Sequence, residues 1–479
     1  MSESVDRRTV LKAGAAAVGA GALAGTGPEL WVPASASTIR PSGVHLTYGA
    51  DPRRGMAVSW ATPASVRRPR LELGTDRHYG LTLAADSRSS KDVGTVYHHV
   101  DLSRLRPGTR YHYRLTHRGA TPVTGTFTTA PAEPRPFRFA AFGDMGVNDA
   151  AAQHVALIGQ QKPDFAFVVG DLCYADTSGG TGAGGPETQD FEVWDRWLRQ
   201  IQPSAATVPW MTTVGNHEME AGNGELGYAG YLDRFTLPGN GAHGAPVTYS
   251  FTYGNVGFIA LDGNDASYEI SRNNGYVGDV LDSWLVRRLT HLREDPDVDF
   301  VVVGFHNCMY CTNLVHGSDG GNRSRWEPIF DRFTVDLVVN GHNHCYERTH
   351  PVRGGAAVRE APKGAAFDSS EGTTYLTAGG AGAAVYNSGG LPTSYVTVEG
   401  GVRVPEATDW SSVVDNEHSI GFVDVRPRDK NGVARMKLTT LSTSGQVIDT
   451  VTLRRTGPIG PGRDDAEERF AVPAVSPRG

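Results

Sequence analysis

The sequence contains little cysteine. Only four of its 479 residues are cysteines, at positions 173, 308, 311 and 345, so at most two disulfides can form, in three possible pairings. Cys308 and Cys311 form a C-x-x-C pair, but a structural zinc site needs four ligands, so this pair alone cannot be one. We interpret the pair as a local disulfide or as two free thiols.

The chain also has no excess of positively charged residues. The 45 lysines and arginines are outnumbered by 52 aspartates and glutamates, which gives a net charge of -7 and a pI near 6.1. This balance excludes a broad basic surface, and we expect no nucleic-acid partner. It does not exclude a small anionic substrate, because bound metal ions can dominate the local charge of a site.

Long hydrophobic runs are absent near the N-terminus. The uncharged stretch over residues 13–28 is rich in alanine and glycine, and it is shorter and less apolar than the roughly 20 residues that span a bilayer. We therefore expect no stable membrane span. The arginine pair at positions 7 and 8 precedes this stretch, and Ala34-Ser35-Ala36 follows it as a small-residue cleavage pattern.

This order of features is similar to a twin-arginine export signal, although a merely basic, flexible N-terminus is the alternative. The resemblance predicts a signal peptide over residues 1–36 and a secreted or cell-surface protein. Twin-arginine export carries folded proteins, which suits a protein that acquires metal before export. Oligomeric state is left open by the sequence.

The chain is long for one domain, and its pattern changes twice. Residues 37–132 contain short alternating runs rich in Val, Tyr, Thr and Leu, separated by Gly and Pro, which predicts an all-β sandwich with Trp60 in its core. A Pro-rich linker over residues 128–136 leads into an α/β domain over residues 133–455. Residues 456–479 are rich in Pro, Gly and charge and predict a flexible tail.

Two segments of the α/β domain have helical periodicity. Apolar side chains recur at i, i+3, i+4 and i+7 in each, first at Trp194, Trp197, Leu198 and Ile201 and then at Trp326, Ile329, Phe330 and Phe333. This spacing favours amphipathic helices whose tryptophans are core residues rather than a binding platform.

Five apolar runs of the α/β domain end in side chains that bind metals. Because sites in open α/β sheets form beyond the carboxyl ends of strands, we expect the five ends to converge on one edge. Each residue alone has an ordinary explanation as a turn residue, helix cap or core histidine. Taken together, side chains with oxygen or nitrogen donors recur at all five ends. They are Asp144, Asp171 with Tyr174, Asn216 with His217, His306, and His342 with His344.

The set is too large for one metal ion. A zinc site usually has three or four protein ligands, whereas seven donors suit two ions bridged by one carboxylate. A carboxylate can bridge because it has two oxygens, while a neutral imidazole offers one lone pair. The phenolate of Tyr174 favours a trivalent ion such as Fe(III).

The ordered blocks "GDMG", "GDLCYAD", "GNHE", "GFHN" and "GHNHCYER" resemble the five blocks of the purple acid phosphatases, a family of calcineurin-like metallophosphoesterases. The preceding domain resembles the fibronectin type III-like domain of the larger plant-type members. The resemblance implies an α/β fold, a four-layer α/β/β/α metallophosphoesterase sandwich preceded by the all-β sandwich.

The resemblance also implies a ligand set and a reaction. The reaction is hydrolysis of small phosphate monoesters at acidic pH, with a metal-bound hydroxide attacking phosphorus. Asp171 bridges the two ions. The other ligands fall into two groups, with Asp144, Tyr174 and His344 holding Fe(III) and Asn216, His306 and His342 holding a divalent zinc, manganese or iron.

Substrate contacts and proton transfer are assigned through the same resemblance. His217 and His316 are the catalytic candidates, and Asn216, His217 and His316 are the substrate-binding candidates. Plant-type members often carry two adjacent histidines here, whereas Val315 precedes His316 in this chain. The identity of the general acid therefore stays open. Further pocket candidates are Asn307, Tyr310 and Glu218.

The spacing of His342 and His344 predicts that both rings face one cleft with Asn343 turned away, because residues i and i+2 of an extended chain project to the same side. Two alternatives to a phosphomonoesterase remain at this point. One is a phosphodiesterase or nucleotidase of the same superfamily, against which Tyr174 argues. The other is an inactive surface-binding protein, against which the complete ligand set argues.

Overall fold

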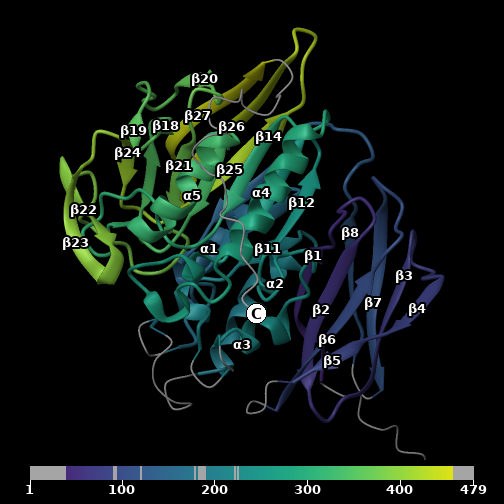
Figure 1. Ribbon diagram of the computed structural model, residues 1–479. Coiled ribbons are helices and arrows are strands. Elements are labelled where there is room, and N and C mark those ends of the chain that lie inside the picture. Colours follow the sequence, from purple (N-terminus) through teal and green to yellow (C-terminus); the bar gives the residue numbers. More distant parts are fainter. Residues whose placement is uncertain are drawn as a thin grey trace, which may run out of the picture. The chain divides into compact units, whose positions relative to one another are not determined.

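The computed structural model describes residues 39–89, 94–118, 121–176, 180–181, 190–220, 223 and 226–456 (Figure 1). The predicted signal peptide and the chain from residue 457 onward lie outside the described residues, so both stay predictions. The last strand, β27 (Val447–Thr456), extends one residue into the segment assigned to the tail. Among the described residues, no helix has the length and apolar character needed to cross a membrane.

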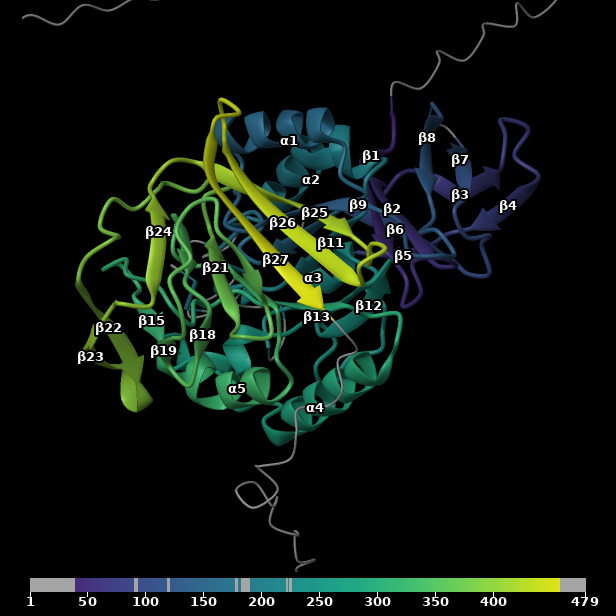
Figure 2. The ribbon, with the colours of Figure 1, turned by 90° about the horizontal axis from the view of Figure 1, so that it is seen from above.

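The N-terminal domain is a sandwich of two four-stranded antiparallel sheets, as predicted (Figures 1 and 2). Apolar side chains of both sheets meet in its core, where Trp60 and Tyr113 are fully buried. The first sheet has the order β1 (Ser42–Tyr48), β2 (Met56–Pro63), β6 (Thr95–Leu102), β5 (Asp86–Arg88), and the second β4 (Leu81–Ala84), β3 (Arg67–Gly74), β7 (Arg110–Arg118), β8 (Val123–Thr128).

The second domain contains two seven-stranded sheets. The first has the order β11 (Trp210–Thr213), β10 (Phe165–Val169), β9 (Phe137–Phe142), β25 (Ser419–Arg426), β26 (Val433–Ser442), β27, β20 (Ala366–Asp368). The second has the order β12 (Tyr249–Tyr253), β13 (Val256–Ala260), β14 (Phe300–Gly304), β16 (Leu337–Asn340), β21 (Thr374–Ala378), β17 (Tyr346–Thr349), β24 (Ser411–Asp415). Smaller pairings join β15 (Ser318–Asp319), β22 (Thr393–Val398) and β23 (Val402–Ala407), and β18 (Val352–Arg353) with β19 (Ala356–Ala357).

The two large sheets pack face to face through aromatic side chains. Phe139 of β9 and Phe165 of β10 each lie 5.1 Å from Phe258 of β13, measured between ring centroids, in edge-to-face geometry that suits aromatic pairs. Helices α1 (Asp149–Gln161) and α2 (Glu192–Ala205) cover the outer face of the first sheet, and α4 (Asp279–Glu294) and α5 (Gly320–Arg332) cover that of the second (Figure 2). This is the predicted four-layer α/β/β/α sandwich.

Both helices predicted from apolar periodicity are present. In α2 the four apolar positions are buried, including both tryptophans, which pack in the core and are not a binding platform. In α5, Trp326 and Phe330 are buried, but the helix ends at Arg332, so Phe333 lies just beyond it.

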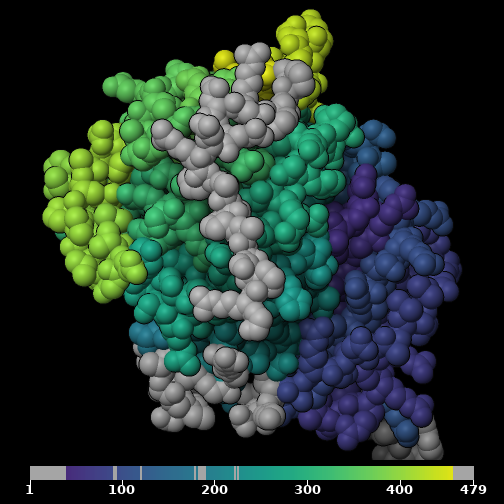
Figure 3. Space-filling model, viewed as in Figure 1, coloured from purple at the N-terminus to yellow at the C-terminus, as the bar shows by residue number. Residues whose placement is uncertain are grey.

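The N-terminal domain packs against α2. Tyr97 and Thr95 of β6 donate hydrogen bonds to the two carboxylate oxygens of Asp195, at 2.7 and 2.8 Å. Figure 3 shows the purple and blue surface of this domain lying directly against the teal surface of the second domain. The contact also includes the two large sheets, where Tyr48 of β1 packs against Phe165 of β10 and Tyr253 of β12.

The five strand ends that carry the predicted ligands belong to two sheets, which corrects the expectation of one sheet edge. Strands β9, β10 and β11 are parallel neighbours in the first sheet, and β14 and β16 are parallel neighbours in the second. Because the sheets pack face to face, the five following loops still meet at one end of the sandwich.

Candidate metal centre

The ligand loops leave their strands through strained turns. Four of the seven predicted ligands have positive φ angles, a conformation that is uncommon outside glycine and concentrates at functional sites. These residues are Asp144 (φ 60°), Asp171 (φ 49°), Tyr174 (φ 56°) and His342 (φ 68°).

Glycines in the motifs make room for the ligands. A Cβ atom on Gly215 would overlap with Oδ1 of Asp171, and one on Gly341 would overlap with Oδ2 of Asp144. The glycines of "GNHE" and "GHNH" are therefore required by close approach to the ligand carboxylates from the other loops.

The first group of donors contains Asp144, Tyr174 and His344. The Tyr174 hydroxyl lies 3.0 Å from Nε2 of His344 and 3.3 Å from Oδ1 of Asp144. His344 Nε2 is in turn 3.4 Å from Oδ1 of Asp144. These are the three residues assigned to Fe(III), and they come from three different strand ends.

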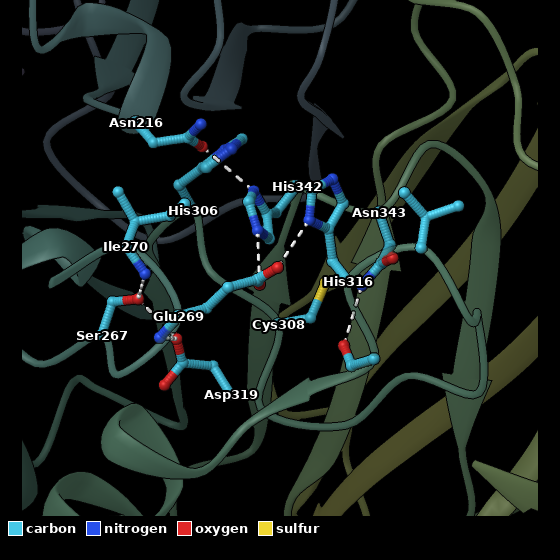
Figure 4. Close-up of polar contacts among 12 residues, drawn as sticks. Asn216, Ser267, Glu269, Ile270, His306, Cys308, His316, Asp319, His342 and Asn343 are labelled. Atoms are coloured by element: carbon cyan, nitrogen blue, oxygen red, sulfur yellow. Dashed lines mark hydrogen bonds and ion pairs between the residues drawn. The ribbon is translucent and has the colours of Figure 1, made fainter. Parts of the chain in front are cut away.

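The second group contains Asn216, His306 and His342, together with Asp171. Oδ1 of Asn216 lies 3.0 Å from Nδ1 of His342 (Figure 4), and Nε2 of His306 lies 3.1 Å from Oδ2 of Asp171. One donor atom each from Asp171, His306 and His342 fit within 4.8 Å of one another. Nε2 of His306 is also 3.8 Å from Oδ1 of Asp144, so the two groups adjoin.

The donor set fits metal ions. Two ligands that each lie about 2.1 Å from one ion are about 3.0–3.4 Å apart, which matches the separations within both groups. Nδ1 of His306 donates to the carbonyl of Val169 at 2.8 Å, so Nε2 carries the lone pair whenever the ring is neutral, as a metal ligand must be. That Nε2 is buried and makes no hydrogen bond of acceptable geometry among the described residues, as expected of an atom built to bind a cation.

His217 lies beside the donors rather than among them. Its backbone N–H donates to Oδ1 of Asp171 at 3.0 Å, and its Nδ1 lies 2.5 Å from Oδ1 of Asp176. Burial lowers the pKa of His217, but Asp171 and Asp176 outweigh burial and raise it to about 9. Its side chain is 18% exposed, whereas that of Asp171 is 2% exposed, so His217 lies at the rim of the site.

His316 lies at the rim beside the second group. Its ring centroid is 4.1 Å from that of His342, and its Nδ1 lies 2.8 Å from Oε1 of Glu269. The structure thus brings all nine predicted site residues together.

Sequence reasoning missed three residues of the site. Asp176 could have been predicted from the sequence, because it is the last residue of the "GDLCYAD" block. Tyr386 stacks on His344 with 4.3 Å between ring centroids, and Glu269 contacts both His316 and His342. Neither Tyr386 nor Glu269 belongs to any of the five blocks, so no sequence signal marked them.

Glu269 is ionised despite its position. Burial raises the pKa of its carboxyl group, but hydrogen bonds from His316 and His342 outweigh burial and lower the pKa to about 2. The carboxylate therefore faces both histidines as an anion.

Two of the three further pocket candidates have other roles. Glu218 is buried and accepts hydrogen bonds from the backbone N–H groups of Asp171, Leu172 and Gly215 at 2.8, 2.9 and 2.7 Å, so it ties two ligand loops together. Tyr310 is buried and donates to Oε1 of Glu327 in α5 at 2.6 Å. Asn307 is fully buried.

The extended-strand explanation for "GHNH" is wrong. Strand β16 ends at Asn340, and His342 has a φ of 68°, so the segment is a loop rather than a strand. Asn343 is anchored elsewhere, with its side-chain N–H donating to the carbonyl of Gly317 at 2.9 Å. His342 and His344 reach different donor groups because the loop turns between them.

All four cysteines lie among the described residues, and all are buried and free. The Cys308 thiol donates to the carbonyl of Gly341 at 2.6 Å, so the C-x-x-C pair is two thiols rather than a disulfide. The Sγ atoms of Cys311 and Cys345 are 4.0 Å apart.

Comparisons with known proteins agree with this geometry. Residues 41–129 match the purple acid phosphatase N-terminal domain, and residues 137–346 match the calcineurin-like phosphoesterase domain. An uncharacterized protein of Mycobacterium tuberculosis is 34% identical over 522 residues, covering 95% of this chain and 96% of its own. Purple acid phosphatase 21 of Arabidopsis thaliana is 32% identical over 259 residues, which cover 53% of this chain and 54% of the plant protein.

A solved structure shares the fold. The structure of purple acid phosphatase PPD1 from yellow lupin (Lupinus luteus) seeds aligns with a TM-score of 0.67 at 21% identity, covering 87% of this chain and 75% of the lupin chain. The four-layer sandwich, with oxygen and nitrogen donors at five strand ends, defines a metallophosphoesterase of the calcineurin-like class. With the matching N-terminal domain and a relative similar over nearly its whole length, the chain belongs to the purple acid phosphatase family.

Proposed function

We propose that this protein is an acid phosphatase that hydrolyses small phosphate monoesters at a dinuclear Fe(III)–M(II) centre, with zinc, manganese or iron as the divalent ion. The observation that carries the proposal is the division of the donors into two adjoining groups, one of which contains the Tyr174 hydroxyl 3.0 Å from His344. A phenolate donor favours a trivalent ion, and the second group has no such donor.

Metal ions held there would lower the pKa of bound water and neutralise phosphate oxygens. The chain's own residues supply the remaining chemistry. Asn216, itself a donor of the second group, and His217, which lies beside the donors, would contact the phosphate. Hydrolysis breaks the bond between phosphorus and the ester oxygen, and the leaving oxygen needs a proton. His217, whose pKa Asp171 and then Asp176 raise to about 9, and His316 at the rim are placed to supply it.

Export by the twin-arginine pathway belongs to the same proposal. It is supported by the order of the arginine pair, the apolar stretch and the cleavage pattern in residues 1–36. We expect small phosphate esters rather than nucleic acid as substrates, because the net charge is negative.

The test combines elemental analysis, a visible spectrum and two assays on the purified protein. We expect one iron and one divalent ion per chain, a visible absorption band, and faster hydrolysis of p-nitrophenyl phosphate than of bis(p-nitrophenyl) phosphate at acidic pH. Preference for the diester would favour the phosphodiesterase alternative, and metal-free, inactive protein would refute the proposal.

Asp171→Asn is the decisive variant. Asn tolerates the positive φ of this position, so the fold is kept while the shared carboxylate is lost. We expect both ions to be lost and activity to fall by at least about 100-fold. Glu327→Gln is the matched control, because Oε1 of Glu327 accepts from Tyr310 and from the Gly355 N–H, and a glutamine oxygen can accept both. It should keep metals and activity.

A further inference from the structure

Each candidate histidine ligand is held through the ring nitrogen that does not face the donor group. Nδ1 of His306 donates to the carbonyl of Val169, and Nδ1 of His344 donates to the carbonyl of Ala384, at 2.8 and 2.9 Å. His342 differs, because its Nε2 lies 3.0 Å from Oε2 of Glu269. One ligand histidine is therefore oriented by a carboxylate rather than by the backbone.

The same carboxylate contacts a second histidine. Oε1 of Glu269 lies 2.8 Å from Nδ1 of His316, and Figure 4 shows the two rings converging on the two oxygens of one side chain. The Glu269 side chain is 13% exposed, so solvent competes little for these contacts. Glu269 thus links a metal-ligand candidate to a proton-donor candidate.

A carboxylate offers only acceptors, so both ring nitrogens that face it must carry hydrogen. With hydrogen on Nε2, neutral His342 has its lone pair on Nδ1, which lies 3.0 Å from Oδ1 of Asn216, on the side of the donor group. With hydrogen on Nδ1, His316 presents Nε2 away from Glu269, 3.4 Å from the Tyr386 hydroxyl. One anion therefore determines both tautomers.

The loop that carries Glu269 is anchored to a helix. Asp319 caps α5 by accepting from the N–H groups of Gly321 and Asn322, at 2.9 and 3.2 Å. The same carboxylate accepts from the Ser267 hydroxyl at 2.5 Å and from the Glu269 N–H at 3.4 Å (Figure 4). The backbone at Glu269 is thus tied to the start of α5.

We propose that Glu269 is a positioning residue that fixes His342 with Nδ1 toward the divalent-metal site and His316 with Nε2 directed away from the carboxylate, so that the second proton of the protonated His316 ring, on Nε2, is the one transferred. The proposal has two halves, the orientation of His342 and the orientation of His316. The His342 half concerns metal binding and needs only the donor set described above. The His316 half rests on the proposed phosphatase function. Carboxylate partners of ligand histidines typically change metal affinity by about 10–100-fold when they are removed.

Direct metal binding by Glu269 is the competing explanation. Donor atoms of Glu269, His316 and His342 lie within 4.8 Å of one another and could surround a further cation. Such an ion would have to bind Nε2 of His342, a ring whose Nδ1 already faces Asn216. The positioning role needs no second ion on one imidazole.

The experiment uses Glu269→Gln in the full-length protein that retains iron but has been stripped of its divalent ion. The two rings face different oxygens of Glu269, and the amide replaces one of these oxygens with an NH2 donor, so it cannot accept from both rings. Titration with zinc alone, followed by calorimetry, should show affinity for the divalent site about 10–100-fold weaker than in the wild type. The visible band should be unchanged, because Tyr174 and His344 do not touch Glu269. Glu327→Gln is the matched control and should bind zinc as the wild type does.

His316→Ala separates the two halves. This variant should lower kcat without weakening zinc binding. Glu269→Gln should reduce kcat less in the His316→Ala background than in the wild type, because the two residues act as a unit. Glu269→Asp, which keeps the charge on a shorter side chain, provides a second variant and should lose less zinc affinity than Glu269→Gln.

Three results would overturn the proposal: zinc affinity of Glu269→Gln within twofold of the wild type, an altered visible band with unchanged zinc binding, or an additional zinc equivalent in the wild type that this variant lacks. A wild type without phosphatase activity would refute the proposed function and the His316 half. The zinc titration would still decide the His342 half.

Discussion

Nε2 of His306 lies 3.1 Å from Oδ2 of Asp171, and neither side chain is more than 2% exposed. Burial lowers the pKa of His306, but the carboxylates of Asp171 and Asp144 outweigh burial and raise it to about 10. Burial raises the pKa of Asp171, but His306 and His217 outweigh it and hold that pKa below its ordinary range. A proton on His306 therefore occupies the place of a cation in the metal-free protein.

The metal-free protein should lose stability as the pH rises. The raised pKa of His306 contributes stability that is fully present below the ordinary 6.5 and is lost as the pH approaches about 10. The lowered pKa of Asp171 contributes stability above the ordinary 3.8, so it does not oppose this trend. Added zinc should restore stability at the alkaline end, because a metal ion replaces the proton.

Thermal unfolding of the metal-free and zinc-loaded protein, measured between about pH 6 and pH 9.5, checks this trend. The metal-free midpoint should fall across this range while the zinc-loaded midpoint falls less. His306→Gln is the control and should flatten the metal-free slope. A metal-free midpoint that rises across the range would contradict the assignment.

Tyr174→Phe should remove the visible band and leave the fold intact. Burial and then Asp144 raise the pKa of the Tyr174 phenol well above its ordinary value, so the phenol stays protonated until a strongly charged cation binds. Phenylalanine fills the same space but offers no oxygen to iron. We expect loss of the band and an iron affinity about 10–100-fold weaker, with an unchanged far-ultraviolet circular dichroism spectrum. Survival of the band would mean that tyrosinate is not an iron ligand.

The sequence predicted which side chains would lie together at the site, because they follow buried strands within short motifs. Asp144, Asp171 and His306 follow apolar runs directly, so local pattern was sufficient to find them. The division of the strand ends between two sheets depends on strand pairing between distant segments, which local pattern does not encode.

Glu269 shows a second limit of sequence reasoning. It lies in a loop without a motif, 73 residues from His342, and only the packing of that loop against Asp319 brings the carboxylate to the site. The geometry of "GHNH" was mispredicted for a related reason. Its loop conformation is set by contacts such as that of Asn343 with Gly317 rather than by the two-residue spacing of its histidines.

The four thiols should be unreactive in the native protein. All four cysteines are buried, and burial is the main cause that raises the pKa of the Cys173, Cys308 and Cys311 thiols above the ordinary value. A thiol reagent such as DTNB should detect no thiol before unfolding and four after it. Two thiols after unfolding would reveal a disulfide, and the pair would be Cys311 and Cys345, whose Sγ atoms are 4.0 Å apart.

Asp176→Asn should shift the pH dependence of catalysis through His217. Asp171 and then the hydrogen bond and charge of Asp176 raise the pKa of His217 to about 9, so loss of the Asp176 charge should lower that pKa by about one unit. If protonated His217 assists the leaving group, the alkaline limb of the kcat/KM profile moves to lower pH by the same amount. Asparagine keeps the size of the side chain, and its oxygen still accepts from Nδ1 of His217.

His217→Ala distinguishes proton transfer from phosphate binding. Loss of a proton donor should lower kcat by about 100-fold or more with a poor leaving group, and much less with p-nitrophenol, which leaves without assistance. Loss of a phosphate contact alone should raise KM equally for both substrates and leave kcat unchanged. Zinc and iron contents should match the wild type in either case, because His217 lies beside the donor groups, and a loss of metal from this variant would show that His217 is a ligand.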